Sequence, residues 1–171
     1  MNKKKILILL ATILVAGLAI WRLWPCALAG HLGDVSQVIR IDGALTISGI
    51  KTETAPLSSN LYMDTYALTV TEDNHTLQAV LEILAQASVR NDFRNLLPWT
   101  LPSVGSDSDH DGRSITLALQ WEDDAHCSLS FLDPTTVAVG LDDGFSVYHF
   151  TSTIPFETLA TLMMAEGTKS S

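Results

Sequence analysis

The sequence has few of the residue combinations that carry chemistry in enzymes. It contains two cysteines and five histidines among 171 residues, and no two of them have the spacing of a zinc site. There is no Gly-x-Ser-x-Gly, no glycine-rich phosphate loop and no His-Glu-x-x-His. Serine, histidine and aspartate occur only scattered along the chain, so no catalytic triad is predicted. We therefore expect a protein that is not an enzyme.

Acidic residues are missing from the first part of the chain. The first 29 residues contain four basic residues and no acidic one. The remaining residues contain six basic and 19 acidic side chains, a net charge of −13. Such an acidic domain is not expected to bind nucleic acid or the anionic surface of a membrane.

The N-terminal segment has the pattern of a membrane or export segment. Lys3-Lys4-Lys5 is followed by an uncharged apolar run from Ile6 to Ile20, and Trp21 and Trp24 follow it. Residues 6–24 are long enough for a transmembrane helix, with the lysines on the cytoplasmic side and the rest of the chain outside the cell. The alternative is a cleaved signal peptide that ends at Ala27-Leu28-Ala29. Residues 1–29 are thus predicted as anchor or signal, and residues 30–171 as an exported or secreted domain.

The two cysteines are not expected to pair with each other. Cys26 lies at the membrane edge or within the signal, and Cys127 lies in the folded part. A bridge between them would tie the domain to its own anchor, although exported compartments permit disulfides. We expect Cys127 to be a small buried side chain.

Alternating apolar residues predict a series of short strands. Asp42-Gly43 has the composition of a hairpin turn, and Asp142-Asp143-Gly144 has it again near the end of the chain. In residues 114–121, Ile115, Leu117, Leu119 and Trp121 fall on one face. The predicted strands are 36–41, 44–50, 61–70, 114–121, 126–132, 136–141 and 145–150.

Two segments have the apolar spacing of amphipathic helices. The first follows a cap at Asp73 or Asn74 and ends near Arg90, or as far on as Leu97. The second has Thr153 as its candidate cap, Pro155 in its first turn and Gly167 after its end. Their apolar stripes are Leu77, Val80, Leu81, Leu84 and Ala87 in the first, and Phe156, Leu159, Ala160 and Met163 in the second.

Strands that are apolar on one side only belong to an antiparallel sheet with one covered face. The sequence therefore predicts an α+β fold of two layers, an antiparallel meander with both helices packed on one face, preceded by the N-terminal helix. The opposite face is expected to be small and polar and to meet water or a partner. Its predicted residues are Thr65, Thr69, Ser114, Thr116, Gln120, Ser128 and Ser130.

The segment from Asp107 to Gly112 resembles the opening of an EF-hand calcium loop. Asp107, Asp109 and Asp111 alternate before a glycine, so their oxygens could turn onto one cation, with the carbonyl of Arg113 as a further ligand. The twelfth position is Ala118 in place of the bidentate glutamate, and a strand is predicted to follow. Glu122 or Asp124 is a candidate for the missing ligand. The alternative is a solvated acidic loop without metal.

The order of the elements resembles small exported domains of unknown function from Gram-positive, often gut-dwelling, bacteria. The similar part covers about residues 60–165. It comprises the strand that ends in Leu68-Thr-Val-Thr-Glu72, the helix Thr76–Leu84, the run of hairpins and the closing helix. That family carries no established activity, so the resemblance implies no functional residue.

These observations predict an exported or membrane-anchored interaction module that binds an unknown protein or glycan. An extracellular calcium-binding domain that uses Asp107, Asp109 and Asp111 is the first alternative. A hydrolase with an unrecognised site is the second. No cofactor other than calcium is predicted.

Overall fold

The computed structural model describes residues 3–22, 24–50, 61–72, 74–92, 95, 112–141 and 144–170. The described part contains three α-helices, two short 3-10 helices and one sheet. The helices are α1 (Lys3–Arg22), η1 (Leu28–His31), η2 (Val35–Gln37), α2 (His75–Gln86) and α3 (Ile154–Glu166). The strands are β1 (Cys26–Ala27), β2 (Val38–Ile50), β3 (Leu61–Thr71), β4 (Ser88–Asn91), β5 (Arg113–Trp121), β6 (His126–Asp133), β7 (Thr136–Leu141), β8 (Gly144–Phe150) and β9 (Thr168–Ser170).

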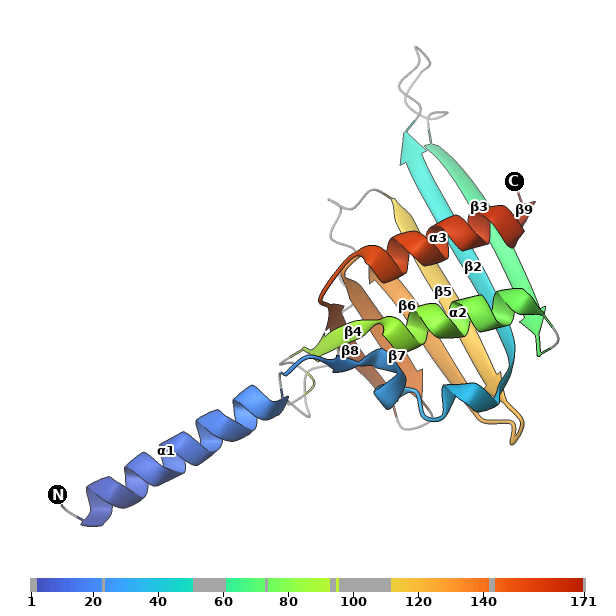
Figure 1. Cartoon of the computed structure of the whole chain (residues 1–171). Helices are drawn as coiled ribbons and strands as arrows, with labels where there is room; N and C mark the ends of the chain where they lie inside the picture. Colours follow the sequence, from blue (N-terminus) through green and yellow to red (C-terminus); the bar gives the residue numbers. More distant parts are fainter. Residues whose placement is uncertain are drawn as a thin grey trace.

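The strands form a single antiparallel sheet in the order β1-β4-β8-β7-β6-β5-β2-β3-β9 (Figure 1). From β5 to β8 each strand pairs with the next one along the chain, and the β2–β3 pair joins this meander through β5. The predicted α+β class with an antiparallel meander is confirmed. The sequence did not predict β1, β4 and β9, because two to four residues are too few to show an alternating pattern.

One face of the sheet forms the hydrophobic core together with α2 and α3, which both cross that face in Figure 1. The apolar sides predicted for β5, β6 and β7 are confirmed, because their side chains are at most 8% exposed. The same cluster includes residues of both helices. The buried residues predicted on these strands are Ile115, Leu117, Leu119, Trp121, Cys127, Leu129, Phe131, Val137 and Val139.

The opposite face, called the outer face below, carries the small polar side chains that were predicted there. All seven of those residues are exposed or half-buried. Phe145 is 67% exposed, and its ring lies against Gly140, where an added Cβ would be 2.5 Å from a ring carbon. A glycine at position 140 therefore lets an aromatic side chain lie flat on this face.

The turn predicted at Asp42-Gly43 is wrong, because both residues lie inside the continuous 13-residue strand β2. Gly43 pairs with Leu68 on one side and with Leu117 on the other. A Cβ on Gly43 would lie 2.8 Å from Leu117 Cδ2 and 3.1 Å from Met163 Cε. The glycine therefore serves close packing between the sheet and α3.

The first helix of the domain is shorter than predicted. Asn74 caps α2 by accepting a hydrogen bond from the backbone nitrogen of Thr76 at 2.9 Å, as expected. The helix ends at Gln86, and the chain then becomes extended at Ala87. Val89 is fully buried in β4 and pairs with Phe150 of β8. Sheet pairing therefore replaces the last predicted turn.

Thr153 occupies the N-cap position of α3, as predicted, but its side chain makes no capping hydrogen bond. The hydroxyl of Ser152 accepts a hydrogen bond from the backbone nitrogen of Ile154 at 3.1 Å. Pro155 lies in the first turn, as predicted, where it has no hydrogen bond to lose.

Helix α1 extends away from the sheet and from the two other α-helices (Figure 1). Its apolar side chains are exposed, with fractions of 71% for Leu7 and 66% for Val15. By length and mean hydropathy, no helix within the described ranges qualifies as a membrane-crossing segment.

The residues that follow α1 belong to the domain and not to the helix. Cys26 and Ala27 pair with Val89 and Ser88 of β4. Leu28 is fully buried in the core, and its nitrogen donates to the carbonyl of Ala87 at 2.8 Å. Leu28 thus packs with the domain, although it falls within the predicted anchor or signal, residues 1–29.

Candidate functional site

The predicted calcium ligands Asp107, Asp109 and Asp111 lie outside the described residues, so the calcium loop stays a prediction. The structure describes the two residues that follow them. Gly112 has a φ of 70° and its carbonyl accepts hydrogen bonds from the nitrogen and the hydroxyl of Ser48. Arg113 begins β5, and Ala118 lies within the same strand.

Glu122 and Asp124, the candidates for the missing ligand, follow the end of β5 that is opposite to Gly112. The strand has nine residues, and a strand rises about 3.3 Å per residue, so Glu122 lies about 30 Å from Gly112. Because Asp107, Asp109 and Asp111 lie outside the described residues, a role for Glu122 or Asp124 as the missing ligand also stays a prediction.

The structure also keeps two of the histidines apart. His126 begins β6, while His149 pairs with Thr136 at the far end of β7. The two histidines lie about 20 Å apart along the strands, so they cannot share a metal ion. Among the residues that the structure describes, no three His, Cys, Asp or Glu side chains are grouped to hold a metal ion.

His149 instead belongs to a polar chain on the outer face. Its Nε2 lies 3.0 Å from Oδ2 of Asp92, which is 4% exposed, and its Nδ1 lies 3.3 Å from the hydroxyl of Thr136. A buried carboxylate needs such a polar partner. In a serine-type triad the hydroxyl lies on Nε2 and the carboxylate on Nδ1, so His149 holds its two partners in the reverse order and gives the hydrolase alternative no support.

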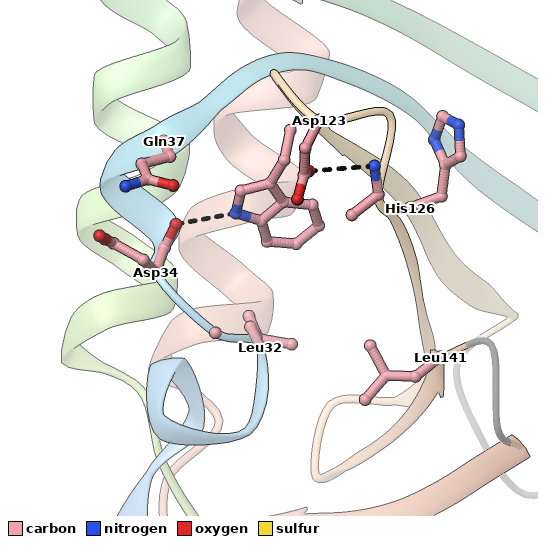
Figure 2. A pocket seen from close by; sticks show the side chains of 9 residues that line it. Leu32, Asp34, Gln37, Asp123, His126 and Leu141 are labelled. Atoms are coloured by element: carbon pink, nitrogen blue, oxygen red, sulfur yellow. Dashed lines mark hydrogen bonds between the residues drawn. The ribbon is translucent and has the colours of Figure 1, made fainter.

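A cavity of about 450 Å³ lies where the segment 32–37 passes over the ends of β5, β6 and β7. We call it the end pocket. Figure 2 shows Asp34 and Gln37 on one wall, with Asp123 and His126 across from them. Its lining residues are Leu32, Gly33, Asp34, Gln37, Trp121, Asp123, Ala125, His126 and Leu141.

One wall of the end pocket is fixed by Asp34. Its carboxylate accepts hydrogen bonds from the nitrogen of Ser36 at 3.0 Å and from the hydroxyl of Ser36 at 2.6 Å. The Ser36 hydroxyl, with the Ser36 backbone amide, holds the pKa of Asp34 below its ordinary value. Asp34 is therefore ionised at neutral pH and carries a negative charge at the pocket wall.

The facing wall is a tight turn after β5. Asp124 has a φ of 61°, in the left-handed region that aspartate tolerates in turns. Oδ1 of Asp123 accepts a hydrogen bond from the nitrogen of Ala125 at 3.2 Å (Figure 2). This turn holds Asp123 at the mouth of the pocket, next to an apolar floor.

The floor combines buried and exposed apolar side chains. Leu32 is 4% exposed and Trp121 is 8% exposed, whereas Leu141 is 43% exposed. An apolar surface beside a few fixed polar groups is the usual composition of a ligand site. Two carboxylates and one imidazole at its rim favour a ligand that donates hydrogen bonds or carries positive charge.

Nothing in the sequence predicts that these residues meet. The pattern predicts Trp121 as the buried end of a strand, and the residues after it only as the link to the strand 126–132. Their neighbours at Leu32 and Asp34 are about 90 positions away in the chain. Only the course of the segment 32–37 across the sheet brings them together.

Comparison of the chain with protein-family models, with curated proteins and with solved structures found no match.

Proposed function

We propose that the chain is a non-enzymatic binding module that α1 holds at a membrane, with the domain outside the cytoplasm. Its end pocket binds a basic side chain of a partner protein. The observation that carries the proposal is the end pocket itself, with an apolar floor and two carboxylates held at its rim.

The membrane part of the proposal rests on the exposed apolar surface of α1. Ten of the large apolar side chains described on this helix are exposed, far more than the scattered apolar residues of an ordinary soluble surface. A lipid membrane would cover them. Because Leu28 is buried in the domain, cleavage after Ala29 would remove a core residue, which favours retention of α1 over release. The ten residues are Ile6, Leu7, Ile8, Leu9, Leu10, Ile13, Leu14, Val15, Leu18 and Ile20.

The partner chemistry follows from charge and shape. An arginine or lysine has a long apolar stem with a cationic head. In the proposed complex the stem would lie against Leu32 and Leu141, and the head would lie near the charges of Asp34 and Asp123. The net charge of −13 beyond residue 29 also attracts a basic partner over a longer range.

Calorimetric titration of the full chain in detergent tests the pocket, with the blocked tripeptide Leu-Arg-Leu as the probe. We expect binding by Leu-Arg-Leu and none by Leu-Gln-Leu, and weaker binding as the salt concentration rises. Asp123→Asn should weaken binding about two- to fivefold, the range expected for an exposed ion pair. Glu82→Gln on the exposed side of α2 is the matched control and should change nothing.

Equal affinity for the two peptides would overturn the basic-partner proposal. Loss of binding in Glu82→Gln as strong as in Asp123→Asn would show only a general effect of net charge. Leu141→Ser tests the apolar floor of the end pocket independently, because it removes apolar contact at an exposed position without changing the charge.

Cell fractionation tests the membrane proposal separately. The full chain should stay with the membranes after an alkaline wash, and the doubly substituted Leu10→Asp and Leu14→Asp chain should leave them. Replacing the same two residues by isoleucine should have no effect. Recovery of the unaltered chain in the soluble fraction would contradict the proposal and leave the pocket unaffected.

A further inference from the structure

A cysteine, a histidine and a tyrosine meet at the edge of the sheet where α1 joins the domain. Sγ of Cys26 lies 3.0 Å from Nε2 of His31. Nδ1 of the same ring lies 3.3 Å from the hydroxyl of Tyr148. The two rings pack against each other with their centroids 4.4 Å apart. A thiol is thus in contact with a base, and a third group orients that base.

Three separate elements build this group. Cys26 lies in the edge strand β1, His31 ends η1, and Tyr148 comes from β8, 117 positions after His31. Tyr148 is 7% exposed and anchored in the core, so its hydroxyl presents a fixed partner to the imidazole. Such a nucleophile, base and orienting group is the general arrangement of an activated side-chain nucleophile.

Both ring nitrogens of His31 have hydrogen-bond partners in place when the ring takes up a proton. When His31 takes the proton of the Cys26 thiol, Nε2–H donates to the sulfur and Nδ1–H donates to the oxygen of Tyr148. Both hydrogen bonds of the imidazolium are then satisfied by groups already in place. The thiolate that remains is the reactive form of cysteine.

Cys127, the other cysteine, provides an internal contrast. Cys26 is exposed, whereas Cys127 is 2% exposed within the core. Burial raises the pKa of the Cys127 thiol to about 11. A soluble reagent therefore meets one exposed thiol beside a base and one thiol that is shielded in the core.

We propose that Cys26, with His31 as its base and Tyr148 as a positioning residue, is a thiol–disulfide exchange site for disulfides of low molecular weight. The thiol proton moves to Nε2 of His31, and Sγ attacks one sulfur of the disulfide. A bond forms between Sγ and that sulfur, and the original sulfur–sulfur bond breaks. The leaving thiolate takes the proton from His31, so Cys26 is oxidised to a mixed disulfide and one thiol is released.

The test uses the full chain in detergent with oxidised glutathione as the probe. Mass spectrometry should show a single glutathione adduct on Cys26 that a reductant removes, and Cys26→Ser should show none. His31→Gln should lower the second-order rate at neutral pH by on the order of tenfold or more. His75→Gln, at the exposed start of α2, is the matched control and should react at the unaltered rate.

Tyr148→Phe keeps the ring and removes the hydroxyl. For a positioning role we expect a lower rate at neutral pH, an unchanged rate at alkaline pH where no base is needed, and an unaltered melting temperature. An equal decrease in the reaction rate at both pH values would show that Tyr148 has a structural role and no positioning role.

A second measurement needs no variant and so does not depend on whether the variants fold. In the unaltered sequence, Cys26 of the folded chain should react faster than Cys26 of the chain unfolded in urea. A folded rate equal to or below the unfolded rate would overturn the proposal. So would a His31→Gln chain that folds and reacts as fast as the unaltered one.

Discussion

The indole nitrogen of Trp121 donates a hydrogen bond to the main-chain oxygen of Asp34 at 2.8 Å. This bond joins the end of β5 to a segment 87 positions earlier in the chain. The same oxygen accepts a second hydrogen bond, from the nitrogen of Gln37 at 3.2 Å. Asp34 thus organises both the entry into η2 and the wall of the end pocket.

Replacing Trp121 by phenylalanine should therefore destabilise the domain and loosen the pocket. The loss of one hydrogen bond and of part of a buried ring predicts a decrease of about 1–3 kcal/mol in the free energy of unfolding. Urea unfolding followed by circular dichroism measures it. Trp24→Phe is the control, because Trp24 is 66% exposed and its replacement should change the stability by less than about 0.5 kcal/mol.

Gly43→Ala should lower stability although alanine suits most strands better than glycine. The added Cβ meets Leu117 and Met163 at distances that force both side chains to move. The expected cost is about 1–3 kcal/mol, as for other overpacked cores. Gly30→Ala is the matched control, since no atom lies within 4 Å of its added Cβ. Equal stability of the two variants would contradict the packing role of Gly43.

A chain that begins at Gly30 should be much less stable than one that begins at Trp24. The shorter chain lacks β1 and the fully buried Leu28. Removing a buried leucine side chain alone costs about 2–5 kcal/mol. Thermal unfolding of the two chains side by side measures the difference, and Leu28→Ala in the longer chain isolates the side chain. Equal melting temperatures would show that cleavage after Ala29 leaves the fold intact.

Cys127 should make the domain less stable at alkaline pH. Its pKa is raised to about 11 by burial, so the unfolded chain releases this proton at a lower pH than the folded chain does. Stability therefore falls as the pH rises from the ordinary cysteine range to about 11, by at most about 1.4 kcal/mol for each pH unit. Urea unfolding across this range should show a shallower decline in Cys127→Ala. An identical decline in both proteins would contradict the prediction.

The sheet and its covered face could be predicted from the sequence because long strands repeat their pattern several times. Residues 114–121 alternate four times, which leaves one choice of buried face. Local sequence patterns did not predict the structure where a tertiary contact decides it. Asp42-Gly43 has the local composition of a turn, but close packing against Leu117 and Met163 explains the glycine. Val89 becomes a strand residue because Cys26 and Phe150 pair with it from either side.

Neither candidate site could be predicted in the same way. The end pocket joins residues 32–37 to the turn after Trp121, and the Cys26 group joins β1 to β8. Contacts over such separations leave no periodic signal in a single sequence. The one site that did have a local signature, Asp107 to Gly112, lies largely outside the described residues.

The two outermost strands, β1 and β9, limit how far the sheet can extend. They contain two and three residues, so each offers little free backbone to the strand of another molecule. Lys169 of β9 also holds its ammonium 2.8 Å from the carboxylate of Asp64, which puts charge beside that border. Short, charged borders of this kind discourage strand-by-strand aggregation. A broad sheet with small polar side chains on its outer face can thus remain a separate molecule at high local concentration.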